Sequence, residues 1–365
     1  MSAALIDLVS VGAQDVFITG DPEVSFFRQN YKRHTNFSMK PERMDYIGTF
    51  AANNEITIPI RSKGDLMSYI WIEATNIASV QNNTAGLFSQ NASSPTEFSL
   101  YIGGQKVSQL DSLFIQGVHN PLLRDNAAKA SYAVTTNSKK ANHGGDHYVI
   151  PFFFGEDYTK SLPLVALQYH DVEIRIKCRD GFTPGSTPKV WGNYIYLDTD
   201  ERKFFTDNEH SLLFTQTQHQ LATNTDTEID LTYFNHPVKS IHLVSGKATG
   251  NDWDSEFTFS KSTLYINGTP LFEETSPVYH HTVVPEMHSS DLPDDILEDL
   301  PTFTWPFCLG LSKSNPTGTL NFSRIDNAKL SLASPSGGNG LHRVYAVNYN
   351  ILKIKQGMGG VAFGN

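Results

Sequence analysis

The sequence predicts an all-β protein in which one sandwich or jelly-roll unit occurs twice. Short segments that alternate apolar and polar residues follow one another along the chain, and helix signals between them are few and brief. The 26 glycines and 18 prolines suit many turns. Segments of the first half recur in the same order in the second half, whereas the spacers differ in length. This pattern indicates a duplicated scaffold with divergent loops.

The repeat consists of five pairs of similar segments. In chain order, residues 55–60 correspond to 228–233, 66–72 to 238–244, 99–104 to 263–268, 151–155 to 306–310, and 167–173 to 320–326. In the third pair, Gly103-Gly104 is matched by Asn267-Gly268. No phosphate-loop sequence follows Gly103-Gly104, so a tight turn is the better interpretation of these glycines.

Strands are expected where apolar and polar residues alternate. Ile56, Ile58 and Ile60 alternate with Thr57 and Pro59, as in a strand with one buried face. The expected strands are 54–60, 66–74, 97–103, 147–154, 165–177 and 190–197 in the first half, and 211–219, 227–234, 238–245, 256–266, 302–309, 318–333 and 343–355 in the second. Short helices are expected within 3–11, 105–118 and 294–300. About eight strands per half with so little helix are typical of a sandwich or jelly roll.

The chain is expected to divide into an N-terminal arm and two halves. We assign residues 1–34 to the arm, 35–200 to the first jelly roll and 201–365 to the second. Charged residues cluster at 198–208, where we expect the hinge between the halves. Long polar stretches, at 76–96, 117–146 and 275–301, are expected to be loop insertions that carry contacts or display.

Charge and cysteine content narrow the class of protein. The net charge of −10 disfavours nucleic acid as a direct partner, because phosphate binding requires a basic surface. The densest basic cluster, Arg28, Lys32 and Arg33, is either a solvated turn or a docking site for an acidic partner or a membrane headgroup layer. Cys178 and Cys308 fall in different halves and are expected to be buried and reduced. No apolar run is long enough to span a bilayer and the N-terminus lacks a basic leader, so we expect a cytosolic chain.

No segment carries a convincing catalytic, cofactor or metal site. A metal requires three or four ligands on rigid elements, whereas the histidines are irregularly spaced in expected loops. These are His143, His147, His280, His281 and His288. The acidic run 291–299 is typical of a solvated face rather than of two carboxylates across a cleft. Nucleotide-binding and nucleophile glycine motifs are missing.

Asn-x-Ser/Thr sequons begin at Asn36, Asn82, Asn91, Asn267 and Asn321. Chance explains most of them in a chain rich in asparagine, and ordinary glycosylation requires a secretory route. Asn82, Asn91 and Asn267 are the candidates for glycan attachment.

Three long motifs, in order from the arm to the last expected strand, point to one family. The first is Gly12-Ala13-Gln14-Asp15-Val16-Phe17-Ile18-Thr19-Gly20, followed by Tyr31-Lys32-Arg33-His34-Thr35-Asn36-Phe37. The second is residues 316–328, and the third is 345–352 with Gly357-Met358-Gly359-Gly360. Residues 162–170 also fit. Together they resemble signature segments of the major capsid proteins of nucleocytoplasmic large DNA viruses, and most closely those of algal viruses.

The resemblance implies two consecutive eight-stranded antiparallel jelly rolls in a non-enzymatic structural subunit that is made in the host cytoplasm. Three copies would form a pseudo-hexagonal capsomer, and capsomers would tile an icosahedral virion shell. Three chains of two similar barrels present six nearly equivalent sides, which suits a ring of head-to-tail contacts. The arm would lie at the capsomer base, so Gln14, Asp15, Arg28, Lys32 and Arg33 are expected to contact minor capsid proteins or the internal membrane.

Two alternatives stay open at this point. The chain is shorter than the algal-virus members, and the aromatic-rich helix expected after the first Ile-Gly-Gly-Gln is weakly represented by 110–118, so a minor-capsid paralogue is one alternative. The other is a carbohydrate-binding or carbohydrate-cleaving jelly roll, which requires an exposed aromatic platform beside paired carboxylates. The tryptophans are scattered, and at least three are expected to pack in the core. They are Trp71, Trp191, Trp253 and Trp305.

Overall fold

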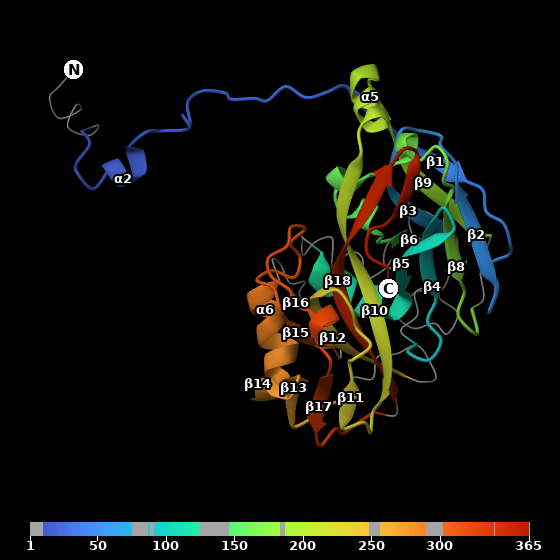
Figure 1. The fold of residues 1–365 in the computed structure, drawn as a ribbon, viewed down its shortest axis with the longest axis vertical. Coiled ribbons are helices and arrows are strands. Elements are labelled where there is room, and N and C mark those ends of the chain that lie inside the picture. The colour runs from blue at the N-terminus through green and yellow to red at the C-terminus, as the bar shows by residue number, and fades with distance from the viewer. Residues whose placement is uncertain are drawn as a thin grey trace. The chain divides into compact units, whose positions relative to one another are not determined.

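The computed structural model describes residues 10–74, 87, 91–124, 146–182, 187–247, 256–289, 302–338 and 340–364. Its contacts divide the chain into two units, Met1–Asn36 and Phe37–Asn365. Within its described part, the first unit contains the short helix α2 (Val16–Thr19). The second unit contains four antiparallel sheets (Figure 1).

Sheets A and B form the first jelly roll. Sheet A has the order β1 (Phe37–Met44), β9 (Lys189–Leu197), β3 (Leu66–Ala74) and β6 (Asp146–Ile150), with β7 (Leu162–Pro163) beside β3. Sheet B has the order β2 (Glu55–Ile60), β8 (Val172–Lys177), β4 (Glu97–Ile102) and β5 (Gln105–Asp111). The chain passes back and forth between the two sheets, which is the jelly-roll connection.

Sheets C and D form the second jelly roll with the same strand order. Sheet C has the order β10 (His210–Thr223), β18 (Gly340–Lys355), β12 (Pro237–Lys247) and β15 (Thr302–Pro306), with β16 (Leu320–Asn321) beside β12 and β19 (Met358–Val361) beside β18. Sheet D has the order β11 (Glu228–Asp230), β17 (Ala328–Ala333), β13 (Lys261–Ile266) and β14 (Thr269–Thr275). The all-β, double jelly-roll prediction is confirmed.

Strand registers test the sequence repeat residue by residue. Ile102 pairs with Val172 in the first roll and Ile266 with Ala328 in the second, so the match of 99–104 to 263–268 is confirmed. The turn residues that follow, Gly103-Gly104 and Asn267-Gly268, all have positive φ. A two-residue hairpin turn with positive φ at both positions favours Gly and Asn for this reason.

Three of the other pairings are shifted. The registers match Ile58, not Ile56, to Ile229. They match Met67 to Val238, one residue away from the predicted pairing. Apolar alternation hides the two-residue shift at Ile58, because the strand presents the same residue types two positions on.

The last pair is shifted furthest. Leu162, not Leu167, corresponds to Leu320, because both lie in the short strand beside the start of β3 or β12. Each short strand then leads into a 3-10 turn, η5 (Leu164–Ala166) or η7 (Phe322–Arg324).

The sequence pattern does not predict β1, β5 and β14. Each lies at the edge of its sheet and carries many polar residues, so apolar alternation is weak there. Residues 105–111, expected to be helical, form β5, and the helices α3 (Ser112–Phe114) and η1 (Ile115–Leu123) follow. The start of the expected loop 275–301 instead holds η6 (Tyr279–Val283) and α6 (Val284–His288).

Several further expected strands are shorter than predicted. The expected ranges 227–234, 256–266, 302–309 and 318–333 are strand only in part. β6 ends at Ile150, and the 3-10 turns η3 (Phe153–Gly155) and η4 (Tyr158–Lys160) come next. Residues 165–171 precede β8 rather than belong to it. A helix, α5 (Thr199–Asp207), occupies the expected hinge and begins at Asp198, whose side chain accepts a hydrogen bond from the Thr199 N–H. The expected helix at 294–300 lies outside the described residues, as do residues 3–9 of the helix expected within 3–11, and residues 10 and 11 are not helical.

Sheet C is buried on both faces in its middle. Val344 and Ala346 belong to the core of the second roll, whereas Tyr345 and Val347 pack with the core of the first. The two rolls therefore share one strand, β18, as a common wall. Cys178 and Cys308 are both buried and unpaired, as predicted. No helix in the described part of the chain is long and apolar enough to cross a bilayer.

Candidate functional site

A buried polar network joins the two jelly rolls of the second unit. Asp111, at the end of β5, accepts hydrogen bonds from the Tyr345 hydroxyl at 2.8 and 2.9 Å and from the Arg343 guanidinium at 3.2 Å. It also accepts the Phe114 N–H at 2.7 Å, which caps α3. Arg343 donates to the Ala92 carbonyl as well. All three polar side chains are more than nine-tenths buried, so Asp111 is the centre of a desolvated polar network across the interface.

Burial and the carboxylate of Asp111 raise the pKa of Tyr345 well above its usual value. The hydroxyl therefore keeps its proton and donates it to Asp111. A carboxylate that accepts from a guanidinium, a phenol and a backbone N–H has most of its lone pairs satisfied, which offsets the cost of burying it. The network fixes the second roll against the end of strand β5 of the first.

Helices α3 and η1 form the apolar part of the same interface. Every residue from Ser112 to Leu122 is buried. The rings of Phe114 and Tyr345 lie 5.2 Å apart, and Thr302 in β15 donates to the Gly117 carbonyl at 3.1 Å. The aromatic contact therefore joins α3 to β18, and the hydrogen bond joins η1 to β15, so both helices are attached to sheet C.

Strand β10 runs beside β5, and its side chains donate hydrogen bonds to the backbone of β5. The Gln216 amide donates to the Val107 carbonyl and the Thr217 hydroxyl to the Gln109 carbonyl, both at 2.6 Å. The outward carbonyls of an edge strand are thereby satisfied. This arrangement joins the rolls without a continuous sheet.

The glycine-rich motif at the C-terminus forms a hairpin that docks on the first roll. The Tyr169 N–H donates to the Gly357 carbonyl at 3.0 Å, and the His170 imidazole contacts the backbone of Gly359. A Cβ on Gly357 would lie 2.5 Å from the Tyr169 ring, and one on Gly359 would lie 2.6 Å from Leu167 Cδ2. Only glycine permits so close an approach at either position.

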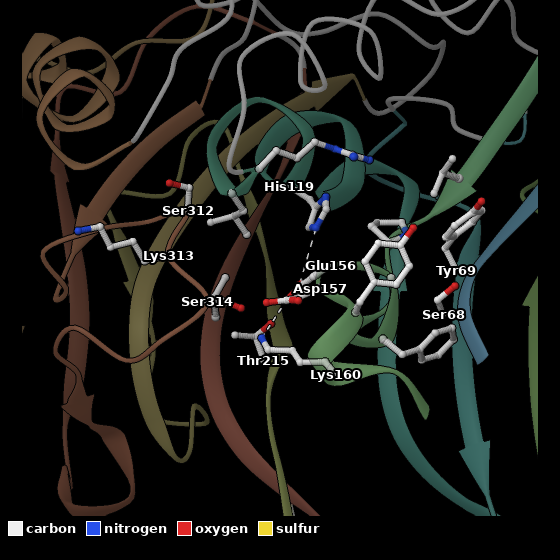
Figure 2. Close-up of a pocket in the computed structure, with 18 of the residues that line it drawn as sticks. Ser68, Tyr69, His119, Glu156, Asp157, Lys160, Thr215, Ser312, Lys313 and Ser314 are labelled. Atoms are coloured by element: carbon white, nitrogen blue, oxygen red, sulfur yellow. Dashed lines mark hydrogen bonds and ion pairs between the residues drawn. The ribbon is translucent and has the colours of Figure 1, made fainter. Parts of the chain in front are cut away.

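A cavity of about 730 Å3 opens between the rolls (Figure 2). His119 from η1 faces Glu156, with Nε2 3.9 Å from Oε1, and the Lys160 ammonium lies 3.3 Å from the other carboxylate oxygen. Burial lowers the pKa of His119 to about 3, and burial raises the pKa of Glu156 against the opposing effect of Lys160. His119 is therefore neutral at physiological pH, and Lys160 is the cation that balances Glu156.

On the second-roll side of the cavity, the Lys239 ammonium donates to the Lys313 carbonyl at 3.3 Å. Burial lowers the pKa of Lys239. No group of three or more His, Cys, Asp or Glu side chains in the described residues is arranged to hold a metal ion.

The histidines singled out in the sequence have structural contacts instead. His280 donates through Nδ1–H to the Thr304 carbonyl, and His281 and His288 donate in the same way to the carbonyls of Thr302 and Cys308. Since a carbonyl only accepts, Nδ1 carries the proton in each. These bonds hold η6 and α6 against the free edge of β15. His143 lies outside the described residues, as do the side chain of His147 and the acidic run 291–299.

The predicted arm residues all lie in the first unit and are exposed. Asp15 accepts a hydrogen bond from the Gly12 N–H at 2.8 Å at the start of α2, next to Gln14. Arg28, Lys32 and Arg33 lie in the exposed backbone that follows. Their role in assembly stays a prediction.

The glycan candidates differ in accessibility. Asn82 lies outside the described residues. Asn91 is buried, and its side-chain oxygen accepts from the backbone N–H groups of Ser93 and Ser94. Asn267 is exposed in its hairpin turn. Whether any of them carries a glycan stays a prediction.

The tryptophans depart from the expectation of core packing. Trp305 is fully buried, but Trp71 and Trp191 stack at 5.7 Å on sheet A and are only half-buried. The Trp191 indole donates to Glu73 at 2.9 Å. Trp253 lies outside the described residues.

The four sheets and their strand order define the class of protein as a double jelly-roll protein. Residues 25–198 match the family model of the major capsid protein N-terminus, and residues 201–360 match that of the large eukaryotic DNA virus major capsid protein. The major capsid protein of Pyramimonas orientalis virus is 31% identical over the full length of both chains, and that of Paramecium bursaria Chlorella virus 1 is 27% identical, also over both full lengths.

Solved structures agree with this fold. A chain of the PBCV-1 virus capsid superposes with a TM-score of 0.75 at 23% identity, over 93% of this chain and all of the other. The Faustovirus major capsid protein gives 0.65 at 10% identity, over 94% of each chain. The chain belongs to the major capsid proteins of large eukaryotic DNA viruses. Its relatives are structural capsid proteins, and its place is the virion shell.

Sequence reasoning missed Asp111, Arg343 and Tyr345 as the centre of the interface. One local signal exists: Arg343 directly precedes the apolar run 344–347 in β18, and a charge in such a strand requires a buried partner. Nothing in the sequence near Arg343 identifies Asp111, which lies 232 residues away.

Proposed function

We propose that three copies of this chain form a pseudo-hexagonal capsomer and that such capsomers tile an icosahedral shell. The observation that carries the proposal is the presence of two jelly rolls of equal strand order fixed side by side by a buried polar network. A rigid pair of equivalent units turns threefold symmetry into six similar sides. An obligate trimer of this kind buries several thousand Å2, roughly two to five thousand on the usual interface scale.

We also infer a docking role for the arm. Phe17, Phe26 and Phe27 are each more than nine-tenths exposed, and Arg28, Lys32 and Arg33 follow within the same stretch. Apolar side chains beside cations suit a partner with an apolar and acidic surface, such as a minor capsid protein, or the headgroup layer of an internal membrane. Synthesis of the chain takes place in the host cytoplasm.

Light scattering after size-exclusion chromatography tests the assembly. The expected mass is three times the 40.6 kDa of one chain, and negative-stain images are expected to show hexagonal outlines. A well-folded chain that stays monomeric at micromolar concentration would overturn the trimer. Deletion of residues 1–36 is expected to leave the trimer intact and to abolish its incorporation into shells. Normal shells from the deleted chain would overturn the role of the arm.

A further inference from the structure

The two rolls have equivalent sheets, but the outer face of sheet C is buried whereas that of sheet A is not. The register between β12 and β18 of sheet C contains a bulge just before Ser240. Shortly after this bulge, His242 pairs with Tyr345, and both side chains are buried. In sheet A, Trp71 pairs with Trp191 at the matching position after the matching bulge in β3–β9. The pair in sheet C is covered by the first roll, whereas the tryptophan pair is half-buried on an uncovered face.

This uncovered face of sheet A, which we call the tryptophan face, carries both apolar and charged side chains beside the stacked rings. Val149 in β6 is paired with Trp71 and is 37% exposed, and Met39 in β1 is 48% exposed. Arg43 is paired with Trp191 and is exposed. Exposed tryptophan, methionine and arginine side chains on one sheet face are typical of a contact surface.

The element that covers sheet C has a counterpart in the second roll. β5, α3 and η1 of the first roll correspond to β14, η6 and α6 of the second, because each set follows the same hairpin turn. In the first roll this element is buried under sheet C. In the second roll, Val278 is 63% exposed, Val283 is 38% exposed and Met287 is 72% exposed. We call this surface the helix face.

The helix face lies on the side of the second roll that is turned away from the first roll (Figure 1). Each chain therefore contains one completed joint between a sheet face and a strand–helix element, and one uncovered half of such a joint at either end.

We propose that the tryptophan face of one copy docks on the helix face of the next, in the geometry of the joint inside the chain. The proposal rests on the trimer proposed above and names the surfaces that close it. Its occupant is a second copy of this chain, since the only sheet face and helix element of the required kind without a partner in the described structure are these two. A head-to-tail joint repeated three times closes a ring.

Two double variants separate the halves of the joint. Met39→Asp with Val149→Asp disrupts the tryptophan face, and Val278→Asp with Met287→Asp disrupts the helix face. All four side chains are at least 37% exposed, so folding is expected to survive, as thermal melting and near-UV circular dichroism would check. The matched controls are Ile47→Asp and Tyr233→Asp, which are 69% and 74% exposed and lie outside both surfaces.

The wild type and both controls are expected to be trimers, and each double variant is expected to be a monomer. A 1:1 mixture of the two double variants retains one intact joint and is expected to give heterodimers only. Trimers formed by either double variant, with a trimeric wild type, would overturn the surfaces and leave the trimer standing. A variant of the helix face that still assembles while the tryptophan-face variant does not would indicate a face-to-face contact and would overturn the head-to-tail joint. A monomeric wild type would overturn both proposals.

A second measurement requires no change in either surface. In a Trp253→Phe background, dilution that dissociates the trimer is expected to shift tryptophan emission to the red and to raise acrylamide quenching at least twofold, because Trp71 and Trp191 become exposed. Trp305 is fully buried and contributes a constant signal. Unchanged quenching on dissociation would overturn the location of the joint.

Discussion

The two jelly rolls have the same strand order, yet the element after their fourth strand differs sharply in burial. In the first roll, β5, α3 and η1 lie under sheet C and every residue from Ser112 to Leu122 is buried. In the second roll, β14, η6 and α6 keep Val278 and Met287 exposed. Since topology is equal, the difference shows that burial in such a protein is decided by neighbours. One chain contains one completed joint, between its own two rolls, and two uncovered halves of such a joint, the tryptophan face and the helix face.

The largest expected effect comes from breaking the completed joint at its polar centre. Replacement of Asp111 by Ala removes the carboxylate that accepts from the buried Tyr345 hydroxyl and Arg343 guanidinium. Arg343 keeps its hydrogen bond to the Ala92 carbonyl but loses its counter-charge. Removal of one partner of a buried pair costs about 3–5 kcal/mol. Urea unfolding monitored by circular dichroism at pH 7 is expected to show a loss of this size.

The matched control is Asp230→Ala. Asp230 accepts the Thr232 N–H from an exposed position at the end of β11, so its loss is expected to cost about 1 kcal/mol. Equal losses for the two variants would show that the network does not hold the rolls together.

The second effect tests the close packing of the C-terminal hairpin against the first roll. A Cβ at Gly359 would lie 2.6 Å from Leu167 Cδ2 and 3.2 Å from Ile102 Cγ2. Overpacking of this kind costs about 1–3 kcal/mol, so Gly359→Ala is expected to lower the free energy of unfolding by that amount. Gly364→Ala, where a Cβ meets nothing within 4 Å, is expected to change it by less than about 0.5 kcal/mol. A silent Gly359→Ala variant would mean that the hairpin does not dock as described.

These two sites differ in how far the sequence predicts them. The glycines of the C-terminal motif are visible in the sequence, although only the structure shows that Tyr169 and Leu167 require them. The repeat itself is also visible, because apolar alternation reports which residues face a core. Asp111 is not predictable, since its partners are brought to it by tertiary contact. Likewise, alternation predicts which face of its own strand Trp71 or Trp191 occupies, but it does not predict what covers that face.

The third effect is a pH dependence in the second roll, where the helix element is held by histidine. Burial lowers the pKa of His280 from 6.5 to about 4. The folded state therefore binds fewer protons than the unfolded state between these values. The stability is fully present above pH 6.5 and is lost as the pH falls toward 4. At pH 5 the contribution of this residue is a loss of about 2 kcal/mol relative to pH 7.

Replacement of His280 by Gln is expected to shrink the difference in unfolding free energy between pH 7 and pH 5 by about 2 kcal/mol. Ser262→Ala removes a hydrogen-bonding partner of the same imidazole at 3.0 Å without removing the titrating group. That control is expected to lower stability at both pH values and to keep most of the difference. An unchanged pH dependence in the His280→Gln variant would refute the burial of a neutral imidazole at this position.

The smallest effect concerns a single hydrogen bond of the completed joint that has no equivalent on the tryptophan face. Thr217 in β10 donates to the Gln109 carbonyl at 2.6 Å, whereas proline, which has no donor, stands at the matching place in β1, Pro41. Thr217→Val keeps the shape of the side chain and removes the donor, so urea unfolding is expected to show a loss of about 1 kcal/mol. Thr215→Val, two residues earlier on the same strand, makes none of the described bonds to β5 and is expected to be neutral. If both variants are neutral, the contact between β10 and β5 is held by packing alone, and the lack of a donor at Pro41 does not weaken the tryptophan face as a docking surface.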